Sequence, residues 1–149
     1  MKNLQRCLAE NQIQPHTPSR QETAELLGIV DRDLEDARIT LLSSDRRFAT
    51  AYNAALQLST TVLHAAGYRT RGAAHHWTTF AVLAEIMGSE QAGRARYFNA
   101  CRSKRNVTDY DSAGSTSEGA VTELIREVEE FKDDVIAWLA RYHPDLMPG

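Results

Sequence analysis

Apolar residues recur along most of this chain at alternating spacings of three and four positions, the period of one helical face. The clearest stretch comprises Val121, Leu124, Ile125, Val128, Phe131, Val135, Leu139 and Tyr142. No stretch shows the period of two that is typical of a half-buried strand. The pattern predicts an all-α protein, an antiparallel bundle of about five helices.

Start and stop signals place the first three helices. The first runs from a capping box at Ser19–Glu22 to about Leu42. The second begins at Ser43–Asp45 and ends near Gly67, a residue suited to a helix C-terminus. The stripe of the third helix consists of Trp77, Phe80, Ala81, Ala84 and Met87. We expect the tryptophans of these stripes, Trp77 and Trp138, to be core or interface anchors.

The fourth helix is predicted to begin near Ser89 or Glu90. Its stripe consists of Arg94, Phe98, Cys101 and Arg105. This phase puts Arg105 at or beside the apolar seam, where a charge is costly unless it is paired or serves a site. A second capping box, Ser115–Glu118, precedes the fifth helix, which His143-Pro144 ends.

The 149 residues suffice for one domain with its own core. Residues 1–18 contain two prolines and little periodicity, so they are predicted to be a flexible N-terminal arm. Residues 19–143 form the single helical domain, and residues 144–149 form a C-terminal tail. The chain shows no membrane-spanning run and no signal-peptide pattern, and Cys7 and Cys101 are expected to be free thiols. These features predict a cytoplasmic protein.

Charge is distributed unevenly although the net charge is only −3. Residues 91–108 contain five cations and no acid, whereas residues 118–134 contain seven acids and two cations. A basic patch of this kind attracts phosphate. The alternative is that the two helices complement each other, or a second copy of the chain, by charge.

The segment Arg102-Ser103-Lys104-Arg105-Asn106-Val107-Thr108-Asp109-Tyr110-Asp111 carries the candidate chemistry. Arg105-Asn106 followed by Tyr110 resembles the signature of the HEPN families, and the resemblance extends over roughly Asp45 to Tyr142. The resemblance implies a small bacterial helical bundle related to toxin ribonucleases and to partners of nucleotidyltransferases. Active HEPN members carry a His where this chain has Tyr110.

That difference bears on catalysis. Metal-free RNA cleavage needs a group that transfers protons near neutral pH and a cation that stabilises phosphate charge. Histidine suits the first task with a reference pKa of about 6.5, whereas tyrosine, at about 10, does not. The resemblance therefore implies RNA or nucleotide binding with impaired or absent cleavage. The alternatives are an active metal-independent endoribonuclease toxin, and a ligand-free helical antitoxin or scaffold.

The predicted RNA- or nucleotide-binding residues are Arg102, Lys104, Arg105, Asn106, Asp109 and Tyr110, with Arg105 and Tyr110 also the candidates for any catalysis. Structural roles stay open for these side chains: ion pairing for Arg105, packing for Tyr110, and solvation for the other two cations. His75 or His76 would replace the missing histidine if the third helix faced Arg105. Their adjacency does not suit metal binding, so no metal and no cofactor is expected.

The predicted partners follow from the same resemblance. We expect a homodimer, because HEPN relatives build their functional cleft across two subunits. RNA or a nucleotide is the expected ligand. A nucleotidyltransferase or another operon partner is the expected protein partner, in a toxin–antitoxin or defence setting.

Overall fold

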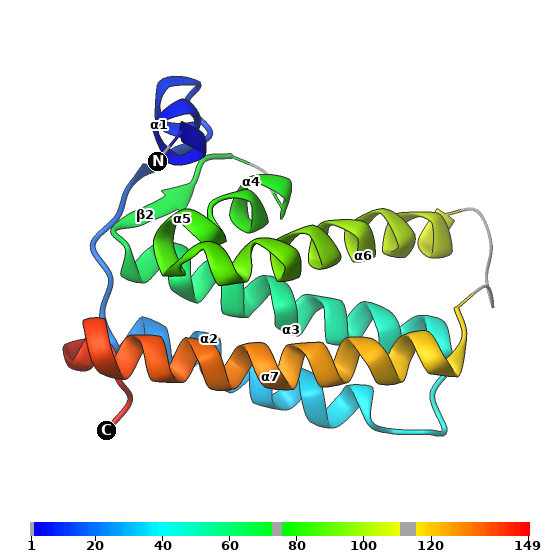
Figure 1. Cartoon of the computed structure of the whole chain (residues 1–149). Helices are drawn as coiled ribbons and strands as arrows, with labels where there is room; N and C mark the ends of the chain where they lie inside the picture. Colours follow the sequence, from blue (N-terminus) through cyan, green and yellow to red (C-terminus); the bar gives the residue numbers. More distant parts are fainter. Residues whose placement is uncertain (1, 73–75, 111–115) are drawn as a thin grey trace.

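The computed structural model describes residues 2–72, 76–110 and 116–149, and for residues 2 and 106–110 it describes the backbone only. The helices are α1 (Lys2–Ala9), α2 (Arg20–Ala37), α3 (Ser44–Ala65), α4 (His76–Ala81), α5 (Leu83–Met87), α6 (Ala92–Tyr110) and α7 (Glu118–Tyr142), with short 3₁₀ turns at Ser89–Gln91 and Pro144–Leu146. Two short strands, β1 (Ile13–Pro15) and β2 (Tyr68–Thr70), accompany them. The prediction of an all-α bundle is confirmed (Figure 1).

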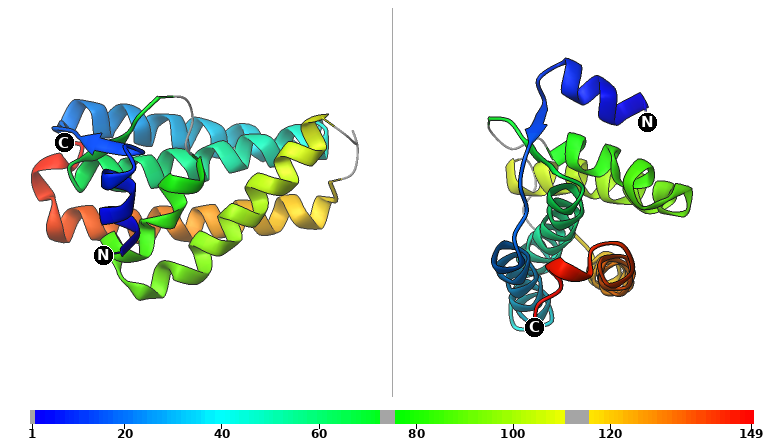
Figure 2. Two further views of the ribbon diagram at one scale, coloured as in Figure 1. Left: turned by 90° about the horizontal axis from the view of Figure 1, so that it is seen from above. Right: turned by 90° about the vertical axis from the view of Figure 1, so that its left-hand side faces the viewer.

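Helix α3 is the centre of the bundle. It contacts α2, α7, α6, α4 and α5, and the end-on view in Figure 2 shows it between the α2 and α7 layer and the α4–α6 layer. The sequence explains this position, since Ala51, Ala54 and Ala55 are fully buried and let neighbouring helices approach closely. The rings of Phe80, Phe98 and Phe131 then join α4, α6 and α7 on one side of α3.

Serine hydroxyls cap the N-termini of three long helices, α2, α3 and α7. Ser19 accepts from the amide of Glu22, Ser43 from that of Arg46, and Ser117 from that of Ala120. Only half of the first capping box is therefore formed. Ser19 caps α2, but the Glu22 carboxylate contacts His16 and His64 instead of accepting from the Ser19 amide. At the last helix the predicted cap, Ser115, is wrong, because Ser117 holds that position.

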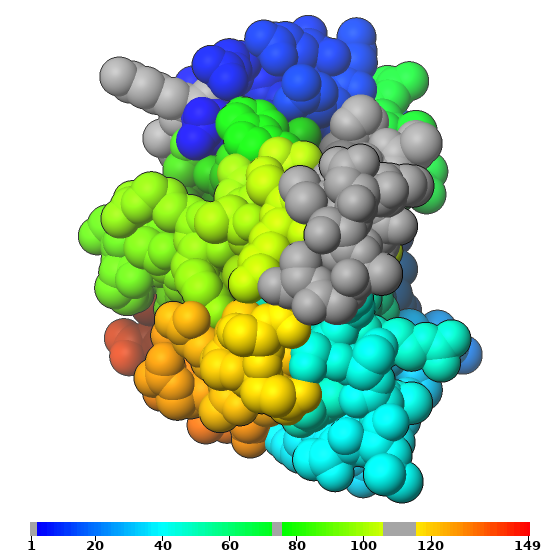
Figure 3. Space-filling model, turned by 90° about the vertical axis from the view of Figure 1, so that its right-hand side faces the viewer, coloured from blue at the N-terminus to red at the C-terminus, as the bar shows by residue number. Residues whose placement is uncertain are grey.

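The first long helix ends earlier than the periodicity predicts. Helix α2 stops at Ala37, and Leu41, which falls inside the predicted helix, is 97% exposed. The buried guanidinium of Arg47 supplies the reason. Its Nε donates to the Ala37 carbonyl over 2.7 Å, and its Nη1 pairs with the Glu118 carboxylate at 2.5 Å. Figure 3 shows this end of the molecule, where the start of α3 lies beside the start of α7.

The predicted third helix is two helices, α4 and α5, with Val82 between them. The Val82 side chain is fully buried in a second small cluster with Leu4, Cys7, Ile13 and Leu63. Trp77 is 39% exposed and so is not a core residue, whereas Trp138 is buried.

The N-terminal segment carries regular structure where the sequence pattern shows little periodicity. Strand β1 pairs antiparallel with β2, with Ile13 opposite Thr70 and Pro15 opposite Tyr68. The Glu85 carboxylate accepts from the amides of Asn3 and Leu4 at the start of α1. These long-range contacts attach the segment to the bundle. Over the described residues, no helix is both long and apolar enough to cross a bilayer.

Candidate functional site

Arg105 lies at the edge of the core, where its position on the apolar stripe of the helix predicts it. On α6 the preceding members of its stripe, Phe98 and Cys101, are buried. Arg105 follows one turn later and is partly buried, with its guanidinium carbon 5.5 Å from the ring centre of Tyr52 on α3. The face of an aromatic ring attracts a cation, so Tyr52 helps to hold the guanidinium in this place.

Tyr52 also joins Arg105 to the start of α4. The Tyr52 hydroxyl and the His76 Nδ1 share a hydrogen bond of 2.8 Å. The Tyr52 side chain is 1% exposed and its ring packs edge-on against Phe80, which fixes the hydroxyl in position. His76 Nε2 is the ring nitrogen that Tyr52 does not engage.

Burial and the neighbouring charges together determine the protonation of this pair. Burial raises the pKa of Tyr52, an effect that the positive charges of Arg105 and Arg102 oppose. Burial lowers the pKa of His76, and the same two guanidinium groups lower it further. At neutral pH the phenol is therefore protonated and the imidazole uncharged. The two arginines concentrate positive charge at this point.

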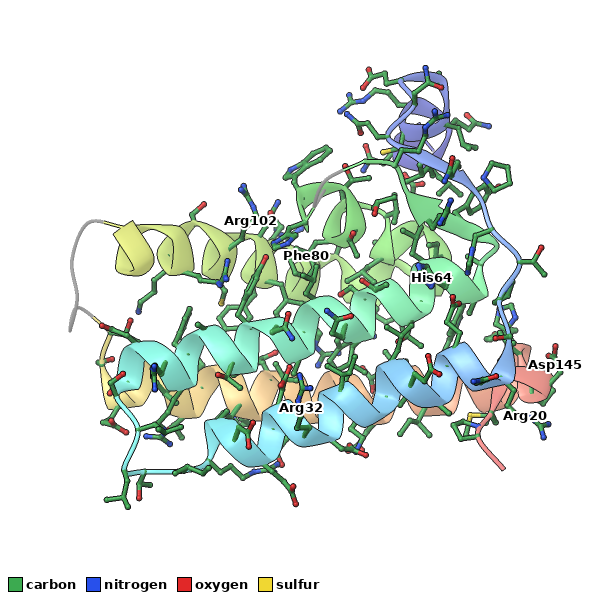
Figure 4. The ribbon with its side chains drawn as sticks, turned by 180° about the vertical axis from the view of Figure 1, so that it is seen from behind. Arg20, Arg32, His64, Phe80, Arg102 and Asp145 are labelled. Atoms are coloured by element: carbon green, nitrogen blue, oxygen red, sulfur yellow. The ribbon has the colours of Figure 1, made fainter. Side chains whose placement is uncertain are left out.

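Arg102 lies one turn before Arg105, on the part of α6 that faces α4 (Figure 4). Its Nε donates to the neutral side chain of Asn99 over 3.1 Å, and its side chain is partly exposed. Residues three apart on a helix are neighbours, with about 5–6 Å between their Cβ atoms. Arg102 and Arg105 thus form a pair, which we call the arginine pair.

Lys104 is not part of this group. Its ammonium lies 5.3 Å from the ring centre of Phe48, beside a hollow of about 140 Å³ that Glu123 of α7 also lines. The other predicted binding residues, Asn106, Asp109 and Tyr110, have side chains outside the described part of the chain. Their roles stay predictions.

The complementary-charge interpretation applies to Arg94 in the same basic segment. Its guanidinium pairs with Asp134 at 2.6 Å, Glu127 at 3.6 Å and Glu130 at 3.8 Å, all on α7. Part of the local positive charge therefore stabilises the contact between α6 and α7 and is not available to a ligand.

The sequence interpretation missed Tyr52 as a site residue and left His76 as one alternative. Tyr52 falls on an apolar helical face with many small residues, so its pattern indicates packing only. His76 is brought near the arginine pair by the packing of α4 against α3 and α6, which spacing along the chain does not reveal. His16, Glu22 and His64, near the other end of α3, form a cluster of metal-ligand type within the described residues.

A comparison with protein-family models identifies the family of the chain. The model of the SAV_6107-like HEPN family matches residues 40–136, nearly two thirds of the chain. The chain belongs to this HEPN family. No curated protein and no solved structure gives a match.

The HEPN match begins just before α3 and ends within α7. It includes Arg102, Arg105, Tyr52 and His76, so the whole described site lies inside the HEPN region. Helix α2 and the N-terminal segment precede the matched region.

Proposed function

We propose that this HEPN protein binds single-stranded RNA through backbone phosphates held by Arg102 and Arg105. The observation that carries the proposal is the arrangement of two guanidinium groups around the hydrogen-bonded pair of the buried Tyr52 and the partly buried His76, where their charges disfavour a protonated imidazole. Two neighbouring guanidinium groups attract a phosphate anion. Arginine suits phosphate because its planar group donates two parallel hydrogen bonds.

Binding without efficient cleavage is the activity we propose. Tyr110 stands where active HEPN relatives carry a proton-transferring histidine, and a phenol is a poor general base near neutral pH. The ring of Tyr110 is suited instead to stacking on an unpaired base.

The protein acts as a homodimer in this proposal. HEPN relatives assemble their cleft from two subunits, and Trp77, next to His76 on α4, exposes 39% of its surface. An exposed tryptophan beside a charged site is typical of an interface anchor. Light scattering should give twice the 16.7 kDa mass of the chain; a mass of one chain at micromolar concentration would refute the dimer. The cellular setting that we propose is toxin–antitoxin or defence, with a nucleotidyltransferase or another operon product as partner.

The RNA proposal is tested by fluorescence anisotropy with a labelled single-stranded RNA over a range of salt concentrations. Each phosphate contact contributes about 0.7 to the slope of log affinity against log salt. Arg102→Gln and Arg105→Gln should each reduce the slope by about that amount and weaken binding about tenfold.

Arg96→Gln is the matched control, because Arg96 is exposed on the same helix and the charge change is identical. It should leave both slope and affinity nearly unchanged. If all three variants bind alike, the arginine pair is not the phosphate site. If wild type binds no RNA, the proposal is wrong.

Metal-independent RNA cleavage is the second candidate function, and the position of His76 favours it. An uncharged imidazole among two guanidinium groups supplies both groups that the chemistry requires. Cleavage that persists in a chelator and disappears in His76→Asn would establish this function in place of binding alone. Cleavage unaffected by His76→Asn would exclude His76 as the proton-transfer group.

A further inference from the structure

Three segments that are distant in sequence converge at the end of α3 opposite the arginine pair. His64 lies near the C-terminus of α3, Glu22 lies in the first turn of α2, and His16 directly follows β1. Figure 4 shows His64 on the part of α3 nearest the N-terminal segment. The His16 amide donates to the Gly67 carbonyl over 2.8 Å, which fixes His16 beside the end of α3.

The three side chains present their donor atoms to one another. His16 Nε2 lies 2.9 Å from Glu22 Oε1 and 3.0 Å from Glu22 Oε2, and His64 Nδ1 lies 3.0 Å from Oε1. One nitrogen from each ring and a carboxylate oxygen all lie within 4.8 Å of one another. The side chains are only 18–30% exposed, so they are partly withdrawn from water yet remain accessible.

We propose that His16, Glu22 and His64 form a binding site for a divalent transition-metal ion, with Zn²⁺ as the ion that their chemistry suits best. Two imidazole nitrogens and one carboxylate are a ligand set that zinc uses, with water in the fourth position. Ligand atoms about 2.0–2.1 Å from a tetrahedral ion lie about 3.3 Å from one another. The two histidine–carboxylate separations need to lengthen by only a few tenths of an ångström.

The three side chains of the cluster also influence one another's pKa. Burial would raise the pKa of Glu22, but the hydrogen bond from His16 and the charges of both histidines bring it below its ordinary value. Burial lowers the pKa of His64, against the opposing charge of Glu22. In the metal-free cluster the ring nitrogens that face Glu22 donate to its carboxylate, and a metal ion would take the place of those protons. Arg69, exposed on β2, also lowers the pKa of His64. Its positive charge repels a bound cation, but solvent screens this repulsion.

The site would attach the N-terminal segment to the bundle. His16 belongs to that segment, whereas Glu22 and His64 belong to two helices packed against each other. A metal ion shared by all three links these parts through coordination bonds, which are harder to break than the strand pairing of three residues on each side. This role does not depend on RNA binding, because the arginine pair lies on other elements.

The test is a titration of chelator-treated, full-length protein with Zn²⁺, followed by calorimetry. Wild type should take up one equivalent, and its thermal midpoint should rise with the zinc concentration. Co²⁺ should give the strong visible absorption of a four-coordinate site. His16→Gln, Glu22→Gln and His64→Gln should each weaken zinc binding at least about tenfold.

His143→Gln is the matched control, since His143 follows α7 and its ring packs on Trp138; it should bind zinc as wild type does. His16→Gln changes a residue outside the helical bundle, so circular dichroism should show an unaltered helix content. No zinc uptake by wild type, or equal uptake by wild type and all three cluster variants, would overturn the proposal.

Discussion

Replacing Arg47 with Met should destabilise the fold, because a buried guanidinium holds the end of α2 against the start of α3. Arg47 is 6% exposed, and its Nε donates to the Ala37 carbonyl, one of the last carbonyls of α2. Helix ends leave such carbonyls without partners inside the helix. Methionine keeps most of the aliphatic packing of Arg47 but cannot donate this hydrogen bond.

The expected loss follows from these contacts. A hydrogen bond made by a charged donor contributes about 1.5–3 kcal/mol. The second contact of Arg47, with Glu118, adds little, because the Glu118 side chain is 68% exposed and solvent screens the pair. A loss of about 1.5–3 kcal/mol corresponds to a fall in the thermal midpoint of roughly 3–12 °C for a chain of this size.

Urea denaturation followed by far-ultraviolet circular dichroism measures this loss. Arg46→Met is the matched control, because Arg46 is the preceding residue, is exposed, and loses the same charge. Surface substitutions of this kind change stability by about 0.5 kcal/mol at most. If Arg47→Met is no less stable than Arg46→Met, the buried hydrogen bond to Ala37 does not secure the end of α2.

Three further predictions concern the core, the pH dependence of stability and the residue at position 110. Phe98→Leu should lower the unfolding free energy by about 1–3 kcal/mol, because Phe98 is fully buried and its ring centre lies 5.6 Å from that of Phe80 and 5.3 Å from that of Phe131. A variant with the denaturation midpoint of wild type would contradict the packing described. Burial lowers the pKa of His64, so the unfolded chain takes up a proton at higher pH than the folded chain, and stability should fall as the pH drops below about 6.5. Denaturation at several pH values should show a shallower fall for His64→Gln, and an equal fall would refute the assignment. Tyr110→His restores the histidine of active HEPN relatives and should raise RNA cleavage above that of wild type in a gel assay; equal rates would show that the residue at this position does not limit cleavage.

Local sequence determined much of the helical architecture. The three/four spacing in residues 121–142 predicts α7, and Ser19 and Ser43 are the predicted N-caps of α2 and α3. The stripe that ends in Arg105 predicts its partly buried position. These features depend on residues within one or two turns of each other, so they can be derived from the sequence directly.

Contacts between distant segments decided the rest. Apolar periodicity favours a helix up to Leu42, yet α2 ends at Ala37. There the buried Arg47 of α3 donates a hydrogen bond to the Ala37 carbonyl. The third predicted helix divides at Val82, because that side chain packs against the N-terminal segment instead of the main core.

The two candidate sites also combine features that the sequence predicts with features that only the tertiary structure reveals. The sequence by itself predicted Arg102 and Arg105 as binding residues, from the basic segment and its resemblance to the HEPN families. Only the tertiary structure placed Tyr52 and His76 beside them and brought His16, Glu22 and His64 within 4.8 Å of one another. The physical reason is that a helix determines the neighbours of a residue only three or four positions away. Which side chains meet across helices depends on how the turns orient whole elements and on the burial that this packing achieves.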